Sequence, residues 1–488
     1  MPTLLETTRS GRRALLGGLA GLATLGRGGR VAARGQRSVR FAFFATDAER
    51  RAYAQLAAAF EATHPDIAVE LVGLDSGDAS LRLGPLMTSP DRPWLQRGGP
   101  YQSWLWSELA SPTAPDVFVL SYQRFPAYAA RGVLEPLGPH LRASAALHAD
   151  DFYPAALDVF RTADIPDDGL GALPLNASRL VVYYNRDLFA GRGVALPTAD
   201  WTWEQFADAA TALTASPDRD GQIGVHGLAI EPRLSRSAAF VWGAGGDLID
   251  DPDQPTTLTL DTPATQEGLR WFAELGPAGR NVTPTSLEAR QFNDLARFAA
   301  GRAAMFVHSR RVVPVLREAR DLHWDVAPLP VGKTPANVLH SDGLCLLAGA
   351  RDKEAAWTFI EFVVGPVGQA VLAATGRTVP SLRTVAQSDA FLRGTTFPFA
   401  RGGEPLGLAP TQAGVFLDNV PIARRLPAMA TLPAVEGMFD RAFKQAFYVD
   451  ADIPNATATI ARDIQGMLGD RLTVPSYLFR EGMTEIEE

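Results

Sequence analysis

The hydrophobic pattern after the first 38 residues predicts a strand, a helix and a second strand. Residues 39–44 combine alternation with aromatic and β-branched side chains, which is typical of a strand. Thr46 and Glu49 have the spacing of a capping box, and apolar residues then recur at helical spacing through 53–60. Residues 67–72 form the next apolar run. A β-α-β opening of this kind favours a parallel sheet.

A second strand-to-helix unit lies in the middle of the chain. The apolar run 180–184 leads into a short loop rich in Gly and Pro, and Thr202 with Gln205 repeats the capping-box spacing. This predicts a buried strand followed by a helix that begins at 202. We expect Trp201 and Trp203 to anchor this helix in a hydrophobic core.

Residues 75–100 interrupt the pattern. Gly, Pro, Ser, Asp and Arg dominate this stretch, and connections of such length without regular structure are uncommon. Two interpretations stay open: a surface loop, which we favour, and a segment that edges a cleft.

Composition adds size and charge to this picture. The chain has 488 residues, 46% hydrophobic and 20% charged, which is enough for two or more hydrophobic cores. The net charge is −8, and residues 1–33 contain five Arg against one Glu, so the rest of the chain carries −12. An acidic body argues against nucleic acid or an anionic membrane as the main partner.

The first 33 residues predict an export signal. Arg12 and Arg13 precede a weakly apolar run, 14–25, which is shorter than the roughly 20 residues that span a bilayer. The arginine pair resembles a twin-arginine signal, with cleavage after Ala33; a basic tail is the alternative. Cys345 is the single cysteine. We therefore expect an extracytoplasmic or periplasmic protein that is not a lipoprotein, with no disulfide within the chain.

Motifs of catalysis are missing from the sequence. It has no Gly-x-Ser-x-Gly, no His-Glu-x-x-His and no phosphate-binding Gly-x-x-x-x-Gly-Lys. The seven histidines show no metal-ligand spacing, and residues 218–221, Asp-Arg-Asp-Gly, do not fit the register of a calcium loop. We expect no catalytic residues, no metal and no cofactor.

Several short motifs, in order along residues 39–390, resemble the family 1 extracytoplasmic solute-binding proteins. Each motif is weak alone, but together they are specific. They include Ala-Pro-Asp-Val-Phe at 114–118, Gly-x-Leu-x-Pro-Leu at 132–137, Trp-Gly-Ala-Gly-Gly-Asp at 242–247, Phe-Ala-Ala-Gly-Arg-Ala-Ala-Met at 298–305, Trp-Asp-Val-Ala-Pro-Leu-Pro at 324–330, and Gly376 to Ser381.

The resemblance implies an α/β architecture, the two-lobed type II periplasmic-binding-protein fold. Each lobe would be a doubly wound sheet, with hinge crossovers near residues 180, 304 and 344. The implied division assigns 1–33 to the signal, 39–179 and 304–343 to the first lobe, 180–303 and 344–470 to the second lobe, and 471–488 to a C-terminal tail.

The resemblance also implies a set of ligand-binding residues around an inter-lobe cleft. For Thr46 and Asp47 the alternative role is helix capping, and for Trp242, matched to a stacking aromatic, it is core packing. Gly245, with Gly246, would let a ligand approach the backbone. The implied residues are Thr46, Asp47, Ser121, Tyr122, Gln123, Arg124, Asn176, Ser178, Trp242, Gly245, Ser309, Arg310, Arg311, Ser341 and Asp342.

One departure from the family pattern bears on the ligand. Sugar-binding members usually carry Gly-x-Trp after the Ala-Met at 304–305, whereas this chain continues to Ser309-Arg310-Arg311. A guanidinium there admits a carboxylate or phosphate on the ligand. In the alternative, both arginines face solvent or pair with acidic neighbours.

The resemblance therefore implies a binding protein rather than an enzyme. We expect a monomer that captures a carbohydrate or carbohydrate derivative, such as a sugar acid or a glycerol-phosphate-like molecule, and delivers it to ABC permease subunits in the membrane. A receptor for a sensor or chemoreceptor is one alternative. A secreted hydrolase that uses Asp247 and Asp342 is another.

Overall fold

The computed structural model describes residues 37–45, 47–75, 101–217, 223–252, 254–392, 410–418 and 422–464. The chain divides into a unit of residues 1–36 and a unit of residues 37–488, and the following concerns the second. The predicted export signal, Thr46, the loop 218–221, the tail 471–488 and most of the 75–100 segment lie outside the described residues, as does the side chain of Asp47.

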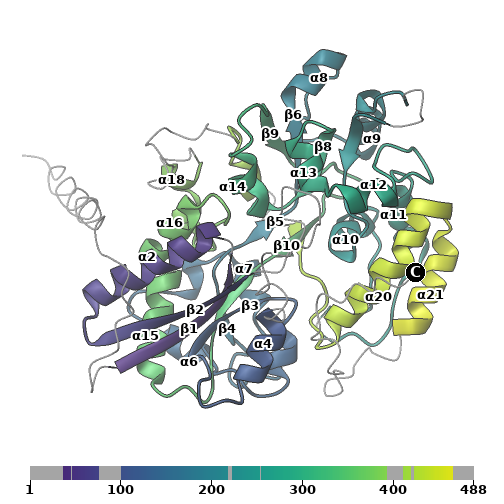
Figure 1. Ribbon diagram of the computed structural model, residues 1–488. Coiled ribbons are helices and arrows are strands. Elements are labelled where there is room, and N and C mark those ends of the chain that lie inside the picture. The colour runs from purple at the N-terminus through teal and green to yellow at the C-terminus, as the bar shows by residue number, and fades with distance from the viewer. Residues whose placement is uncertain are drawn as a thin grey trace, which may run out of the picture. The chain divides into compact units, whose positions relative to one another are not determined.

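The first lobe contains a five-stranded sheet in the order β2-β1-β3-β11-β4 (Figure 1). Strand β1 runs parallel to β2 and β3, whereas β11 is antiparallel to β3 and β4. Helix α2 connects β1 to β2, so the predicted β-α-β opening is confirmed. The strands are β1 (Arg37–Ala45), β2 (Ile67–Asp75), β3 (Val117–Ser121), β4 (Ala172–Pro174) and β11 (Asp342–Leu346).

Helices from distant parts of the chain cover this sheet. Phe359 of α15 lies 5.3 Å from the ring of Phe41, so a late helix packs directly on the first strand. The helices of this lobe are α2 (Asp47–Thr63), α4 (Tyr101–Glu108), α5 (Phe125–Ala129), α6 (Gly138–Ala143), η2 (Ala149–Asp151), α7 (Pro154–Asp158), α15 (Lys353–Val364), α16 (Pro366–Ala374), α17 (Arg383–Ala386) and α18 (Asp389–Leu392).

The second lobe contains a four-stranded sheet in the order β7-β8-β6-β9. Strand β6 is antiparallel to β8 and β9, and β7 is parallel to β8. The strands are β6 (Val181–Asn185), β7 (His226–Ala229), β8 (Ala303–His308) and β9 (Trp324–Ala327). The helices are α8 (Arg186–Arg192), α9 (Trp203–Leu213), α10 (Leu234–Gly243), α11 (Pro263–Ala273), α12 (Ser286–Gln291), α13 (Asp294–Ala299), η3 (Arg310–Val312), α14 (Val313–Leu316), α20 (Leu432–Gln445), η5 (Ala446–Asp450) and α21 (Ile453–Ile464), and α19 (Val415–Asp418) packs on the β6 side.

The local predictions around residue 202 are confirmed. Thr202 N donates to Gln205 Oε1 at 2.8 Å, and Gln205 N donates back to Thr202 Oγ1 at 3.3 Å, which is a capping box at the start of α9. Trp201 and Trp203 are 4% and 7% exposed, and the Trp203 ring stacks on Trp271 at 4.5 Å. Both tryptophans therefore anchor α9 in the core.

A small three-stranded sheet joins segments that lie between the two larger sheets. It has the order β12-β10-β5, with β5 (Ser178–Arg179), β10 (Asn337–His340) and β12 (Ala423–Arg424). Strand β5 leads directly into β6, so the chain leaves the first sheet next to the predicted position 180.

The strand pairing corrects the rest of the predicted division. Residues 303–308 form β8, which pairs with β6 inside the second-lobe sheet, so 304 is not an entry into the first lobe. Residues 342–346 form β11 of the first-lobe sheet, and α15 and α16 pack in the same lobe, so 344 does not begin the second lobe. An apolar run does not reveal its strand partner, because pairing depends on contacts far apart in sequence.

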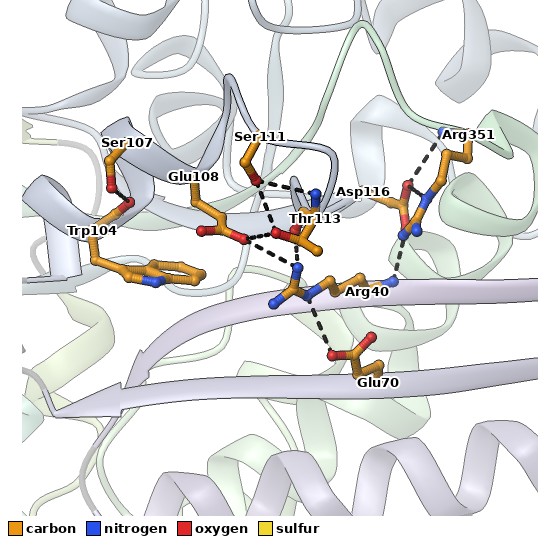
Figure 2. Close-up of polar contacts among 9 residues, drawn as sticks. All are labelled: Arg40, Glu70, Trp104, Ser107, Glu108, Ser111, Thr113, Asp116 and Arg351. Atoms are coloured by element: carbon orange, nitrogen blue, oxygen red, sulfur yellow. Dashed lines mark hydrogen bonds and ion pairs between the residues drawn. The ribbon is translucent and has the colours of Figure 1, made fainter. Parts of the chain in front are cut away.

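Asp116, directly before β3, joins this strand to β1 and to the loop between β11 and α15 (Figure 2). This residue is 1% exposed; its Oδ2 accepts from Arg40 N and from Arg351 Nη2, each at 2.8 Å, and its Oδ1 accepts from Arg351 N at 3.3 Å. Arg40 extends the network to Glu108 at 3.2 Å and Glu70 at 3.4 Å. The buried carboxylate thus has partners on both oxygens.

Among the described residues, no single helix is long and apolar enough to cross a membrane; α15 and α16 pass that test only as a pair bent by 54°.

Candidate functional site

Polar side chains gather at the opposite edge of the first-lobe sheet, where β1, β3 and β4 end and β11 begins. Asp342 lies opposite Ser121 in the β11–β3 register. Asn176 Nδ2 donates to Asp342 Oδ2 at 3.2 Å, and Ser341 Oγ donates to the Asn176 carbonyl at 2.5 Å. Carboxyl ends of strands are the usual ligand edge in α/β proteins. The structure therefore brings four of the predicted site residues together.

Two buried residues that the sequence reasoning missed join this edge. Arg377, just after α16, pairs through Nη1 with the carboxylate of Glu49 on α2, and their side chains are 3% and 6% exposed. The spacing of Glu49 indicates only a helix cap. Arg377 lies within the 376–381 motif, which is the one sequence signal for this pair. Burying an ion pair costs free energy of desolvation, so the pair beside Asp342 is a candidate for a functional role.

A narrow cavity lies within this cluster. Its volume is about 10 Å³, close to the space of one water-sized group. Its polar lining comes from both missed and predicted positions: Glu49, Tyr53, Asn176, Asp342 and Thr378. Its apolar lining is Phe44, Val119, Leu175 and Leu372. We name this set, together with Arg377, the Glu49 cluster.

Arg310 packs in the interior, with the side chain 1% exposed. Its guanidinium carbon lies 4.2 Å from the Phe391 ring centre and 4.8 Å from that of Phe416, and Nε donates to the Gly376 carbonyl at 3.0 Å. Burial, then the charge of Arg317, lowers the pKa of Arg310 to about 9. The neighbouring Ser309 carbonyl accepts from Tyr183 Oη at 2.9 Å. Arg310 thus serves aromatic packing.

Arg311 lies in a different environment from Arg310. It is half-buried, and its charge, with that of the buried Arg236, acts on His340. Burial is the larger cause, and together these effects lower the pKa of His340 to about 3, so its imidazole is neutral at physiological pH. His340 pairs in register with Ser178 at the start of the small sheet. Of the two predicted arginines, Arg311 is the one near the polar edge.

The residues that follow β3 reach helix α20. Gln123 Nε2 donates to Glu436 Oε1 at 2.8 Å, and the charge of Arg124 acts on the same carboxyl. Burial, followed by the nearby Asp440, raises the pKa of Glu436 to about 7. Tyr122 is 3% exposed and lies edge-on to His340, with ring centres 6.5 Å apart.

Trp242 and Gly245 have local structural partners. Trp242 is 4% exposed; Nε1 donates to Asp247 Oδ1 at 3.2 Å, and the Arg424 guanidinium lies 4.7 Å from the ring centre. Gly245 has φ of 83°, the left-handed region that favours glycine, at the turn after α10. The Arg424 guanidinium therefore covers the ring of Trp242, and the turn after α10 explains why residue 245 is a glycine.

A larger groove of about 750 Å³ lies elsewhere, a volume in the range of small-molecule sites. None of the predicted site residues lines it. Its walls are the loop 161–169, residues 254–256 and 428–430, and Pro126 and Ala130 of the α5 region.

Within the described part of the chain, no group of three or more His, Cys, Asp or Glu side chains is arranged to hold a metal ion. Cys345 is buried and free, as expected for a small apolar side chain, and burial raises the pKa of its thiol.

The sequence is similar to that of known bacterial binding proteins. Residues 98–398 match the family model described as bacterial extracellular solute-binding protein. A Brucella abortus protein described as a binding protein is 25% identical over 263 residues, which cover 53% of this chain and 60% of that protein. The mannitol-binding protein of Pseudomonas aeruginosa is 26% identical over 375 residues, 71% of this chain and 74% of that protein.

Solved structures resemble the fold over most of the chain. An ABC substrate-binding protein of Listeria monocytogenes, in complex with cycloalternan, aligns with a TM-score of 0.73 at 20% identity, covering 89% of this chain and 99% of that one. A Mycobacterium tuberculosis protein in complex with glycerophosphocholine aligns with a TM-score of 0.69 at 19% identity and the same coverage. These likenesses confirm the predicted two-lobed type II fold.

Proposed function

The chain belongs to the bacterial extracellular solute-binding proteins, and we propose that it is the substrate-binding component of an ABC importer for a carbohydrate or carbohydrate derivative. The observation that carries this proposal is the polar cluster at the carboxyl ends of β1, β3 and β4. Carboxylates, an amide, hydroxyls and a guanidinium meet there, and they are the groups that hold the hydroxyls of a polyol or sugar.

The relatives support this ligand class. One is a mannitol-binding protein, and the structural neighbours were solved with an oligosaccharide and with glycerophosphocholine. All are binding proteins, which agrees with a function without catalysis. Ligand capture between the lobes, followed by closure, would give the permease a liganded form to recognise.

The charges near His340 support a place for an anionic group. Arg311 and Arg236 both act on this histidine, and His340 itself adds no positive charge. A carboxylate or phosphate on a carbohydrate derivative would gain charge-assisted hydrogen bonds from either guanidinium. Arg310 has no part in this proposal, because its guanidinium packs between two aromatic rings.

The cellular setting belongs to the same proposal. Residues 1–33 would direct export by the twin-arginine route, the mature protein would be a monomer without a lipid anchor, and permease subunits would receive its ligand. The pair Arg12-Arg13 and the apolar run that follows it support the export step.

A thermal-shift screen of the mature chain against mannitol, maltose, sugar acids and glycerophosphocholine tests the function. A ligand at 100 times its dissociation constant should stabilise the protein by about 2.7 kcal/mol. Arg311→Ala should reduce the shift given by anionic ligands and leave that of neutral ones unchanged. If no carbohydrate derivative changes the melting temperature, the proposed ligand class is wrong.

A further inference from the structure

Thr378 presents an unusual hydroxyl within the Glu49 cluster. The residue is 6% exposed, and its Oγ1 has no hydrogen-bond partner among the residues that the structure describes. It also lines the 10 Å³ cavity. Buried hydroxyls without a partner are rare, since each one loses its hydration without compensation. A partner that enters the cavity would remove this cost.

Arg377 adds a second observation of the same kind. Its Nη1 meets Glu49, but Nε and Nη2 lack a hydrogen-bond partner within the described parts of the chain, although the residue is 3% exposed. A guanidinium offers five N–H donors in a planar fork. The unpartnered hydroxyl of Thr378 therefore lines the cavity together with Glu49, and Glu49 is the ion-pair partner of the guanidinium that has donors to spare.

The lining determines which chemical group fits. The two carboxylates of the lining, Glu49 and Asp342, only accept hydrogen bonds. Arg377 does not line the cavity but pairs with Glu49, and its guanidinium only donates. An oxygen placed among them must both donate and accept, as a hydroxyl does. A phosphate or carboxylate oxygen can only accept, and it would face two like charges. The volume suits one such group, and the apolar lining suits the carbon that bears it.

We propose that Thr378, Arg377, Glu49 and Asp342 form a subsite for a single hydroxyl group of a polyhydroxylated ligand. This assignment rests on the proposed function and deepens it. The cluster requires a neutral, hydroxyl-bearing end on the ligand, even where the other end carries an anionic group near Arg311. Sugars, sugar alcohols and glycerol derivatives meet this requirement, and simple dicarboxylates or inorganic phosphate do not.

Thr378→Val provides the test, because valine has nearly the same shape and lacks the hydroxyl. Titration calorimetry with mannitol, maltose and glycerophosphocholine would measure affinity, and thermal unfolding without ligand would measure stability. The variant should bind the wild-type ligand about tenfold more weakly. Its unliganded melting temperature should stay equal or rise, because an unpartnered buried hydroxyl is removed.

Thr283→Val is the matched control. Thr283 is 1% exposed, its Oγ1 likewise has no partner among the described residues, and it does not line the cavity. This variant should show the same change in melting temperature with unchanged affinity. Arg377→Lys is a second probe: it keeps a charge opposite Glu49 but loses the fork, and it should also weaken binding at least tenfold.

The outcomes separate the two proposals. If the wild type binds a probe and Thr378→Val binds it equally well, the subsite is wrong and the function stands. If Thr378→Val loses stability together with affinity, the hydroxyl has a structural role and the subsite is again wrong. If the wild type binds none of the probes, the proposed function fails, and the subsite fails with it.

Discussion

At the amino ends of β1 and β3, Asp116 has partners on both oxygens, whereas at the carboxyl ends Arg377 uses one nitrogen and leaves two without partners in the described structure. Both side chains are almost fully buried, at 1% and 3% exposed. Both belong to the same lobe and join segments far apart in sequence. The two ends of one sheet thus carry buried ion pairs that differ in how completely their atoms are satisfied.

The difference separates a structural ion pair from one poised to bind. A buried charge with all its atoms paired fixes the register of the strands that it joins (Figure 2). A buried charge with spare donors beside a cavity costs free energy in the unliganded protein, and natural sequences keep such costs mainly where function requires them.

Arg377→Met should give the largest loss of stability. It leaves the buried Glu49 carboxylate without its cation, and breaking a buried pair in this way costs about 3–5 kcal/mol. Urea denaturation would measure the free energy of unfolding. The double variant Glu49→Leu/Arg377→Met should recover most of the loss in stability, while ligand binding stays at least tenfold weaker than in the wild type. A double variant as unstable as the single one would show that the pair itself holds the fold.

Asp116→Ala should destabilise the protein by about 2–3 kcal/mol, because it strips the Arg40 amide and the Arg351 guanidinium of their acceptor. Ligand affinity should be unchanged. Paired denaturation and binding measurements check both statements. Arg351→Ala is the control and should cost less than Asp116→Ala, because Asp116 keeps the amides of residues 40 and 351 as donors. If Asp116→Ala changes the affinity for ligand, the assignment of a structural role to the amino ends and a binding role to the carboxyl ends of the sheet is wrong.

The smallest expected effect is the pH dependence of stability that comes from two buried carboxyls of α20, Glu436 and Asp440. Glu436 contacts Gln123 just beyond the carboxyl end of β3. Burial raises the pKa of Glu436 to about 7 and that of Asp440 to about 6. In the unfolded chain these groups ionise near pH 4. Between about pH 4 and 7 these two carboxyls therefore bind more protons in the folded state, and their contribution to stability falls as pH rises. His340, with its pKa lowered to about 3, contributes a change of the opposite sign between about pH 3 and 6.5.

Melting temperatures of the wild type and of Glu436→Gln across this pH range would isolate the contribution of Glu436. Relative to the wild type, the variant should gain stability as pH rises from about 4 to 7. Asp352, whose hydrogen bond with Arg37 lowers its pKa to about 2, acts mainly below this window. An equal pH dependence of stability in the variant and the wild type would contradict the prediction.

Part of the candidate site could be predicted from the sequence. Motif positions led to Asn176, Ser341 and Asp342, which the structure joins by hydrogen bonds. From the sequence alone Arg310 and Arg311 are equivalent, because they are adjacent residues of the same type. The two arginines differ only in the tertiary structure, where Phe391 and Phe416, more than 80 residues later in the chain, pack against the guanidinium of Arg310.

The sequence by itself determined the local elements and the family: the strand 181–185, the capping box at Thr202, the buried tryptophans of α9 and the two-lobed fold. These follow from spacing and short motifs, which act within a few residues. The tertiary structure alone decided that β8 joins the second lobe, that β11 joins the first, and that Arg377 meets Glu49 across 328 positions. Strand partners and buried ion pairs depend on which distant segments pack together, and no local pattern records that choice.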